Sequence, residues 1–108
     1  MWGNKSEYDL IVTIVEKGNA EDVIEFSKKG GAEGGTILGG RGAGIHETTK
    51  ILGILIEPEK EVVLTLIRKE KTEAVLNEIN KGMELEKPGY GIAFVVDVPR
   101  VVGITHEG

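Results

Sequence analysis

The residues of this sequence that could bind a ligand lie in two glycine-rich stretches. The first, residues 39–50, holds four glycines around Arg41, and the second, residues 86–91, places Tyr90 between two glycines. Glycine lacks a Cβ atom, so its backbone can adopt positive φ values or lie close against a ligand. Successive bare amides in such turns can also form a nest that binds an anion. Both stretches are therefore candidate binding loops for a small negatively charged molecule.

The first stretch matches neither of the two common phosphate-binding motifs. A Walker A loop ends in Gly-Lys-Ser/Thr, which does not follow residues 39–44. A dinucleotide fingerprint leads into a helix, whereas the strand-like residues 51–56 follow this loop. Long loops in compact domains are usually functional or disordered. A flexible hairpin tip without a ligand is the ordinary alternative.

His46 and Glu47 could ligate a metal, contact a partner or act in a small enzyme. The chain has two histidines, His46 and His106, and it has no cysteine. Loop residues in contact with solvent are the simpler interpretation, so we predict no metal site. An enzyme is the weakest hypothesis, because the sequence shows no set of nucleophile, base and orienting residue.

An acidic run at residues 57–61 could supply acid–base chemistry. Glu57, Glu59 and Glu61 alternate, which places them on one face of an extended chain. Like charges on one face repel each other. We therefore interpret this run as a solvated strand edge that includes one basic residue, Lys60.

The composition limits the class of protein. A length of 108 residues predicts a single domain, residues 1–108, and the net charge of -5 argues against nucleic acid as a partner. The absence of cysteine excludes disulfides and thiolate catalysis. No apolar run approaches the ~20 residues that span a bilayer, and the N-terminus lacks an apolar signal core. We expect a cytoplasmic protein that is not embedded in a membrane.

The hydrophobic pattern predicts two helices and four main strands. Residues 8–15 and 61–68 alternate in steps of two, as strands do. Asn19 and Thr72 are candidate N-caps of two amphipathic helices. Shorter extended runs lie at residues 35–38, 51–56 and 92–98. The order β-α-β-β-α-β predicts an α+β, ferredoxin-like fold, with an antiparallel four-stranded sheet and two helices on one face.

The two alternating strands are apolar on both faces. In residues 8–15 and 61–68, the set of side chains that faces the helices and the set that faces away both contain Val, Ile or Leu. Since helices cover one face only, the other face needs a second cover. A closed, symmetric oligomer formed through the sheets is the simplest one.

Three segments of the sequence resemble the P-II nitrogen regulatory proteins. They are Gly40-Arg41-Gly42, Gly44-Ile45-His46-Glu47 and the run GYGIAFVVDVPRV at residues 89–101. In that family, the last segment is a Gly-X-Gly loop that leads into a Phe-Val-X-Asp-Val strand and then Arg-Val. With the order of elements, the resemblance covers residues 9–102, and the C-terminal motif is its most specific part.

The resemblance implies a homotrimer that regulates other proteins and is not an enzyme. Family members bind ATP or ADP in clefts between subunits, and often 2-oxoglutarate through a long T-loop. That loop then docks onto a transporter, an enzyme or a transcription regulator. In this chain the resemblance places the T-loop at about residues 41–54, the B-loop at about 83–91 and the C-terminal loop at 102–108.

The resemblance also implies which residues meet each ligand. The nucleotide, expected to be ATP, ADP or AMP, would contact Gly40, Arg41, Gly42, Lys60, Gly89, Tyr90 and Gly91. The partner protein would contact Arg41, Ile45, His46, Glu47, Thr48, Thr49 and Lys50. The ring of Tyr90 could stack on a base, seal a cleft between subunits or simply plug its own loop.

Some positions depart from the family pattern. Ile92 replaces the basic residue after the second B-loop glycine, and Gly103 and Thr105 replace two arginines that grip phosphates. The T-loop also has no tyrosine, so the uridylylation of some members has no acceptor. Two functions stay open: an effector-sensing regulator, with nitrogen metabolism as its expected setting, and an interaction module that has lost its nucleotide.

Overall fold

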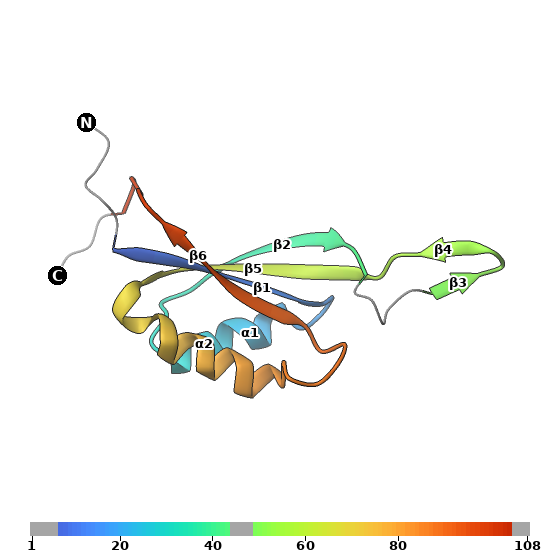
Figure 1. The fold of residues 1–108 in the computed structure, drawn as a ribbon, viewed down its shortest axis with the longest axis horizontal. Coiled ribbons are helices and arrows are strands. Elements are labelled where there is room, and N and C mark those ends of the chain that lie inside the picture. Colours follow the sequence, from blue (N-terminus) through green and yellow to red (C-terminus); the bar gives the residue numbers. More distant parts are fainter. Residues whose placement is uncertain (1–6, 44–48, 105–108) are drawn as a thin grey trace.

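A computed structural model describes residues 7–43 and 49–104 of the chain, and it has the ferredoxin-like fold predicted from the sequence. A four-stranded antiparallel sheet lies over two helices, and a small hairpin projects from one end (Figure 1). The order of strands across the main sheet is β2-β5-β1-β6. The elements are β1 (Tyr8–Glu16), α1 (Ala20–Lys29), β2 (Thr36–Arg41), β3 (Thr49–Ile51), β4 (Ile54–Ile56), β5 (Glu59–Arg68), α2 (Lys69–Met83) and β6 (Ile92–Val98).

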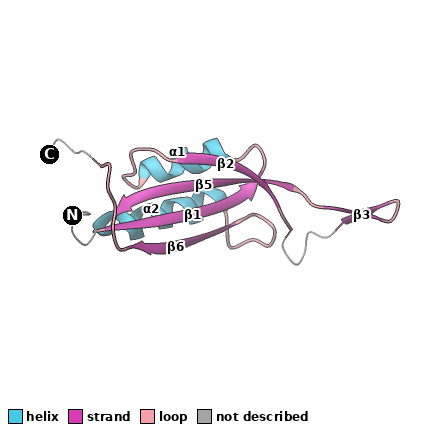
Figure 2. Ribbon diagram, turned by 90° about the horizontal axis from the view of Figure 1, so that it is seen from above, coloured by secondary structure: helices cyan, strands magenta, loops and turns pink. Residues whose placement is uncertain are grey.

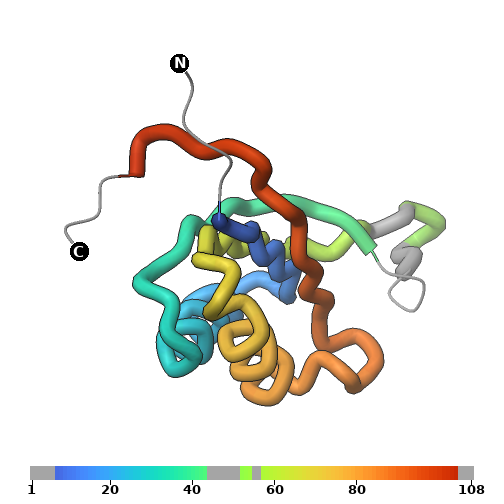
Figure 3. Tube along the Cα trace, turned by 60° about the vertical axis from the view of Figure 1, so that its left-hand side comes forward, coloured from blue at the N-terminus to red at the C-terminus, as the bar shows by residue number. Residues whose placement is uncertain are grey.

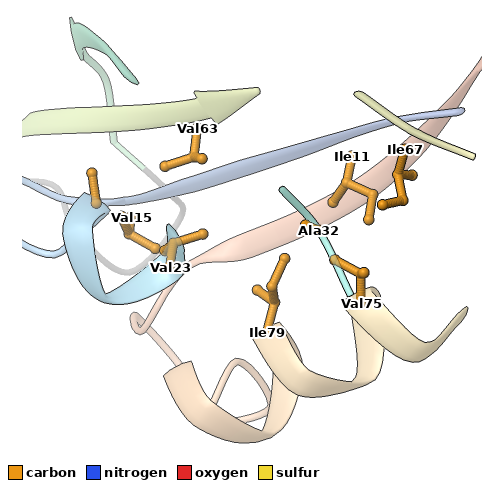
Figure 4. Close-up of a cluster of buried hydrophobic side chains, with 9 residues drawn as sticks. Ile11, Val15, Val23, Ala32, Val63, Ile67, Val75 and Ile79 are labelled. Atoms are coloured by element: carbon orange, nitrogen blue, oxygen red, sulfur yellow. The ribbon is translucent and has the colours of Figure 1, made fainter. Parts of the chain in front are cut away.

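The hydrophobic core fills the space between the sheet and the helices. Alternate residues of β1 and β5 point to the helices, so Ile11, Val15 and Val63 are almost completely buried. Figure 4 shows them facing residues of α1 and α2 such as Val23 and Ile79. The two helices lie side by side under this face of the sheet (Figure 2).

Asn19 is the N-cap residue of helix α1, as predicted, but the predicted side-chain hydrogen bond is absent and a distant residue binds the amides instead. Asn19 precedes the helix but its side chain makes no cap hydrogen bond. Instead, Oε1 of Glu61 on β5 accepts hydrogen bonds from the backbone amides of Gly18 and Ala20, at 2.9 and 3.0 Å. This carboxylate also lies at the positive end of the helix dipole. Glu61 is therefore not the simple solvated edge residue that the sequence suggested.

Helix α2 begins at Lys69, directly after β5, so its N-cap residue is Arg68 and the predicted cap by Thr72 is wrong. The buried hydroxyl of Thr72 donates a hydrogen bond to Oδ2 of Asp9 on β1 at 2.8 Å. Nζ of Lys69 lies 2.6 Å from Oδ1 of Asp9 and 2.5 Å from Oδ1 of Asp97 on β6. We call these four residues the α2 clamp. It fastens the start of the helix to two neighbouring strands.

The segment that was expected to be one strand, residues 51–56, is divided by a turn. Ile51 of β3 pairs with Ile54 of β4, so Leu52 and Gly53 form a two-residue hairpin loop. Both loop residues have positive φ, at 53° and 80°. This hairpin extends away from the sheet and the helices (Figures 1 and 2).

The sheet face away from the helices carries a continuous band of apolar side chains. The register aligns them in rows across three strands. The rows are Leu66, Leu10 and Val96; Leu64, Val12 and Phe94; and Val62, Ile14 and Ile92. Phe94 is 43% exposed and Ile92 is 56% exposed, while both helices lie on the other side (Figure 3). We call this set the open sheet face.

Candidate functional site

The first glycine-rich stretch begins inside the sheet rather than in a loop. Strand β2 continues to Arg41, so Gly40 pairs with Lys60 and Arg41 pairs with Glu59 on β5. The backbone amide of Gly42 then donates to the carbonyl of Pro58 at 3.1 Å, which closes the base of the projecting segment. The structure thus brings together four of the predicted nucleotide-binding residues at one rim of the sheet. They are Gly40, Arg41, Gly42 and Lys60, and we call this place the β2–β5 rim.

A carboxylate lies between two cations at this rim. Nζ of Lys17 lies 2.9 Å from Oε2 of Glu59, and the backbone amide of Lys17 donates to the Glu59 carbonyl at 3.3 Å. The hydrogen bond from Lys17 lowers the pKa of Glu59, and the charge of Arg41 lowers it further. The same hydrogen bond raises the pKa of Lys17. Glu59 therefore stays ionised at neutral pH, and its negative charge offsets the positive charge that Lys17 and Arg41 would present to a phosphate.

Sequence reasoning missed Lys17 and misread Glu59. Both belong to a pair that joins the turn after β1 to the start of β5, 42 positions apart. Nothing local marks such a pair. One signal was available. Strands β1 and β5 were each predicted correctly, and an antiparallel pair of these strands would place the turn that holds Lys17 beside the start of β5.

The second glycine-rich stretch is an ordered turn that follows α2. Glu84 ends the helix in a left-handed conformation, and its carboxylate accepts a hydrogen bond from Nζ of Lys87 at 2.6 Å. This contact raises the pKa of Lys87. Nζ of Lys87 also lies 5.5 Å from the centroid of the Tyr90 ring, which is a cation–π distance. Tyr90 is 46% exposed, so one face of the ring can meet another molecule.

The two glycines beside Tyr90 are glycines for different physical reasons. Gly89 has a φ of 80°, and a Cβ atom there would meet nothing within 4 Å, so there is open space where a side chain would otherwise lie. Gly91 has a φ of 137°, and a Cβ atom there would lie 2.8 Å from the carbonyl oxygen of Ile14. Gly91 is thus required by the close packing of this turn against β1. Its open neighbour Gly89 is the better placed of the two for a ligand.

Within one protomer the two candidate loops lie at the same end of the sheet but at opposite edges. The register places Lys60 opposite Glu16, near the end of β1 where Ile14 pairs with Ile92. Strands β5 and β1 separate the two edges, a distance of about three strand spacings or ~14 Å. The structure therefore does not bring Gly89, Tyr90 and Gly91 into contact with the β2–β5 rim.

Several predicted partner-binding residues lie outside the described residues. They are Ile45, His46, Glu47 and Thr48; Thr49 and Lys50 begin strand β3. Thr105, at one of the positions that depart from the family, also lies outside. In residues 7–43 and 49–104, no cluster of three or more His, Asp or Glu side chains could hold a metal ion. Over the same ranges, no helix is long and apolar enough to cross a membrane.

Comparison with known proteins identifies the family. The family model described as "Nitrogen regulatory protein P-II" matches residues 8–107, so the chain belongs to the P-II family. A search of curated proteins finds no match. Among solved structures, the chain is similar to Arabidopsis thaliana PII bound to citrate, with a TM-score of 0.68 and 24% identity over 92% of this chain and 82% of that one.

A second solved structure is similar to the chain over nearly its whole length. It is CPII from Thiomonas intermedia K12, a nitrogen regulatory PII-like protein bound to ADP, AMP and bicarbonate. The TM-score is 0.66 and the identity is 18%, over 90% of this chain and 96% of that chain. At these identities the two structures show that the fold is shared.

Proposed function

We propose that this chain is a trimeric regulator, not an enzyme, that senses an adenine nucleotide in clefts between protomers. The bound state is passed to a partner protein through residues 41–54. The observation that carries the proposal is the position of the two glycine-rich loops. They share one end of the sheet but lie at opposite edges, so a site that uses both must be built from two protomers.

The open sheet face supplies a reason for protomers to associate. Its apolar rows reach the edge strand β6, where Phe94 is 43% exposed. On the opposite edge, Leu38 of β2 pairs with Val62 and extends one row; it is 48% exposed. Burial of such a face is favourable by about 25 cal/mol for each Å² of apolar area removed from water. Association of three copies through this face would place the β2–β5 rim of one protomer beside the Tyr90 loop of the next.

The two similar structures support a small anion as the effector. The Thiomonas protein was solved with ADP, AMP and bicarbonate, and the Arabidopsis protein with citrate. In this chain, Arg41 and Lys60 provide positive charge, and Gly89, next to Tyr90 in sequence, leaves open space where a side chain would otherwise lie. Because Glu59 offsets part of that charge, we propose ADP or AMP in preference to ATP. A cytoplasmic location and a role in nitrogen metabolism belong to the same proposal.

Calorimetric titration of the purified chain with AMP, ADP and ATP tests this proposal. We expect saturable binding of about one nucleotide per protomer. A charge-assisted hydrogen bond contributes about 1.5–3 kcal/mol, so Arg41→Ala should weaken binding at least tenfold. Lys28→Ala, which removes an exposed cation from α1, is the matched control and should bind as the parent does. A folded trimer that binds none of these nucleotides would contradict the proposal.

The second candidate is an interaction module without a nucleotide. It is favoured by the charges at the two loops, which are largely paired within the chain: Glu59 with Lys17, and Lys87 with Glu84. Ile92 adds no charge beside the second loop. Under this hypothesis, the same titration shows no heat with any nucleotide, while a partner protein binds equally well with and without them.

A further inference from the structure

The tip of the β3–β4 hairpin has an unusual residue at its turn. The loop between the paired residues Ile51 and Ile54 consists of Leu52 and Gly53, both with positive φ. Positive φ at both central residues is the pattern of a type I′ turn, where Asn-Gly is the preferred sequence. Leucine is disfavoured in this conformation, because its Cβ atom approaches the following carbonyl oxygen. The chain therefore places a large apolar residue where a small polar one would fold more easily.

Among the residues that the structure describes, almost nothing covers the side chain of Leu52 to compensate for this strain. It is 96% exposed, the highest value among the exposed large hydrophobic residues of the described chain. Ile54, which directly follows the turn, is 64% exposed. The hairpin extends from the body of the protein in both views (Figures 1 and 2). Strain and exposure both act against Leu52 in the isolated protein, and contact with another molecule would offset both.

We propose that Leu52, with Ile54 beside it, is an apolar knob that inserts into an apolar pocket of the partner protein. This inference rests on the proposed function, in which residues 41–54 dock the partner. It adds the contact residue and the chemistry of the surface that receives it. A convex tip that carries one fully exposed leucine fits a concave pocket better than a flat surface or a helix groove.

The charge of the chain favours a protein pocket over a membrane surface. The acidic residues Glu57 and Glu59 follow β4 and lie at the base of the hairpin, not at its tip. The whole chain carries a net charge of -5, and an anionic bilayer would repel it. The pocket that receives Leu52 is therefore expected to be uncharged and to belong to a folded protein.

The variant Leu52→Asn separates the proposed contact of Leu52 with the partner from the stability of the hairpin. Asn-Gly is the best sequence for this turn, so the variant removes the apolar side chain while it stabilises the hairpin. A purely structural role for position 52 predicts that binding is retained or improved. If Leu52 inserts into a pocket of the partner, Leu52→Asn should weaken binding of the partner although the hairpin is better formed. Leu52→Met keeps an apolar side chain of similar size and is the matched control.

The partner is first identified by a photo-crosslinking amino acid at position 52 of the full-length chain, in the cells that produce it. The same group at Glu25, an exposed residue of α1, controls for chance contact. A protein crosslinked from position 52 alone is then purified and titrated with each variant. We expect Leu52→Asn to weaken its binding at least tenfold, and Leu52→Met to change it less than threefold. Equal affinity for the parent and Leu52→Asn overturns the knob.

Deletion of residues 49–56 distinguishes failure of the knob from failure of the proposed function. If the deletion abolishes partner binding but Leu52→Asn does not, the loop docks the partner and the knob is wrong. If the deleted chain still binds the partner, docking through this loop is wrong as well. No specific crosslink from position 52, or flotation with phosphatidylglycerol vesicles that depends on Leu52, also overturns the knob.

Discussion

Glu61 connects three parts of the chain through one carboxylate. It is contributed by β5, accepts hydrogen bonds from two amides at the start of α1, and lies opposite Val15 at the end of β1. Charge-assisted hydrogen bonds to free helix amides are among the stronger single contacts on a protein surface. Lys60 and Glu59, which lie at the β2–β5 rim, directly precede Glu61 on the same strand. By holding α1 against β5, Glu61 therefore also helps to hold the rim in place.

Replacement of Glu61 by alanine is predicted to lower the free energy of unfolding by about 1 kcal/mol, the usual cost of a lost helix cap. Glu61→Gln should cost less, because its amide oxygen can still accept both hydrogen bonds. Urea denaturation measures both values. Asn19→Ala is the control, and it should have a smaller effect, since Asn19 makes no side-chain cap. A larger cost for Asn19→Ala than for Glu61→Ala would contradict this account of the helix start.

At the scale of elements, the α2 clamp makes the docking of the helix depend on pH. Hydrogen bonds from Lys69 and Thr72 lower the pKa of Asp9 below its ordinary value of 3.8. A group with a lowered folded pKa stabilises the protein above its unfolded pKa, and this contribution is lost as pH falls through the folded value. The pKa of Lys69 is raised, by Asp9 first and then by Asp97, so its contribution is lost only above pH 10.5.

The expected result is an acid-sensitive step that depends on Asp9. Between about pH 5 and pH 2, the stability of the parent chain should fall more steeply than that of Asp9→Asn, which has no charge to lose. Urea midpoints measured across this range give the comparison. Glu25→Gln, an exposed substitution on α1, should follow the parent curve. Parallel curves for the parent and Asp9→Asn would show that the clamp does not contribute in this way.

The same elements show what sequence could and could not predict. The alternation in residues 8–15 and 61–68 predicted two strands and their faces correctly, because period-two patterning follows directly from the pleat. Asn19 and Thr72 looked like caps by type and position. The structure instead uses Glu61 for α1 and ties Thr72 to Asp9, which is 63 positions away. Such partners depend on the order of strands in the sheet, which no local pattern records.

The candidate site was predictable to a similar extent. Both glycine-rich stretches were found from composition, and Gly40, Arg41, Gly42 and Lys60 do gather at one rim. The turn at Leu52 and Gly53 was missed because the segment is apolar throughout and lacks an Asn-Gly signal. The separation of the Tyr90 loop from the rim is a property of sheet order, so sequence could not show that the two loops lie at opposite edges of one protomer.

At the scale of the whole molecule, one assembly would account for both the open sheet face and the separation of the two glycine-rich loops. An apolar face that reaches both edges of a small sheet is costly in water for a single protomer. A symmetric assembly would cover this face and would bring each rim to a neighbouring Tyr90 loop. The nucleotide would then bind only to the assembled form, and binding would stabilise the assembly.

Phe94 and Val95 provide a matched test, because they are neighbours on β6 that face opposite sides of the sheet. They are exposed to similar extents in the protomer, 43% and 40%. Phe94→Asp places a charge in the open sheet face and should dissociate the assembly, since a buried unpaired charge costs several kcal/mol. Val95→Asp should leave it intact. Light scattering is expected to give three times 11.6 kDa for the parent and Val95→Asp, and 11.6 kDa for Phe94→Asp.

The nucleotide titration completes this test, because it links assembly to the site. A folded, monomeric Phe94→Asp chain retains Arg41, Lys60 and Tyr90 but has no neighbouring protomer, so it should lose most of its affinity for ADP and AMP. Circular dichroism confirms that the variant is folded. If the monomer binds nucleotide as tightly as the parent, the site lies within one protomer. A parent chain that is itself monomeric would show instead that the open sheet face serves another partner.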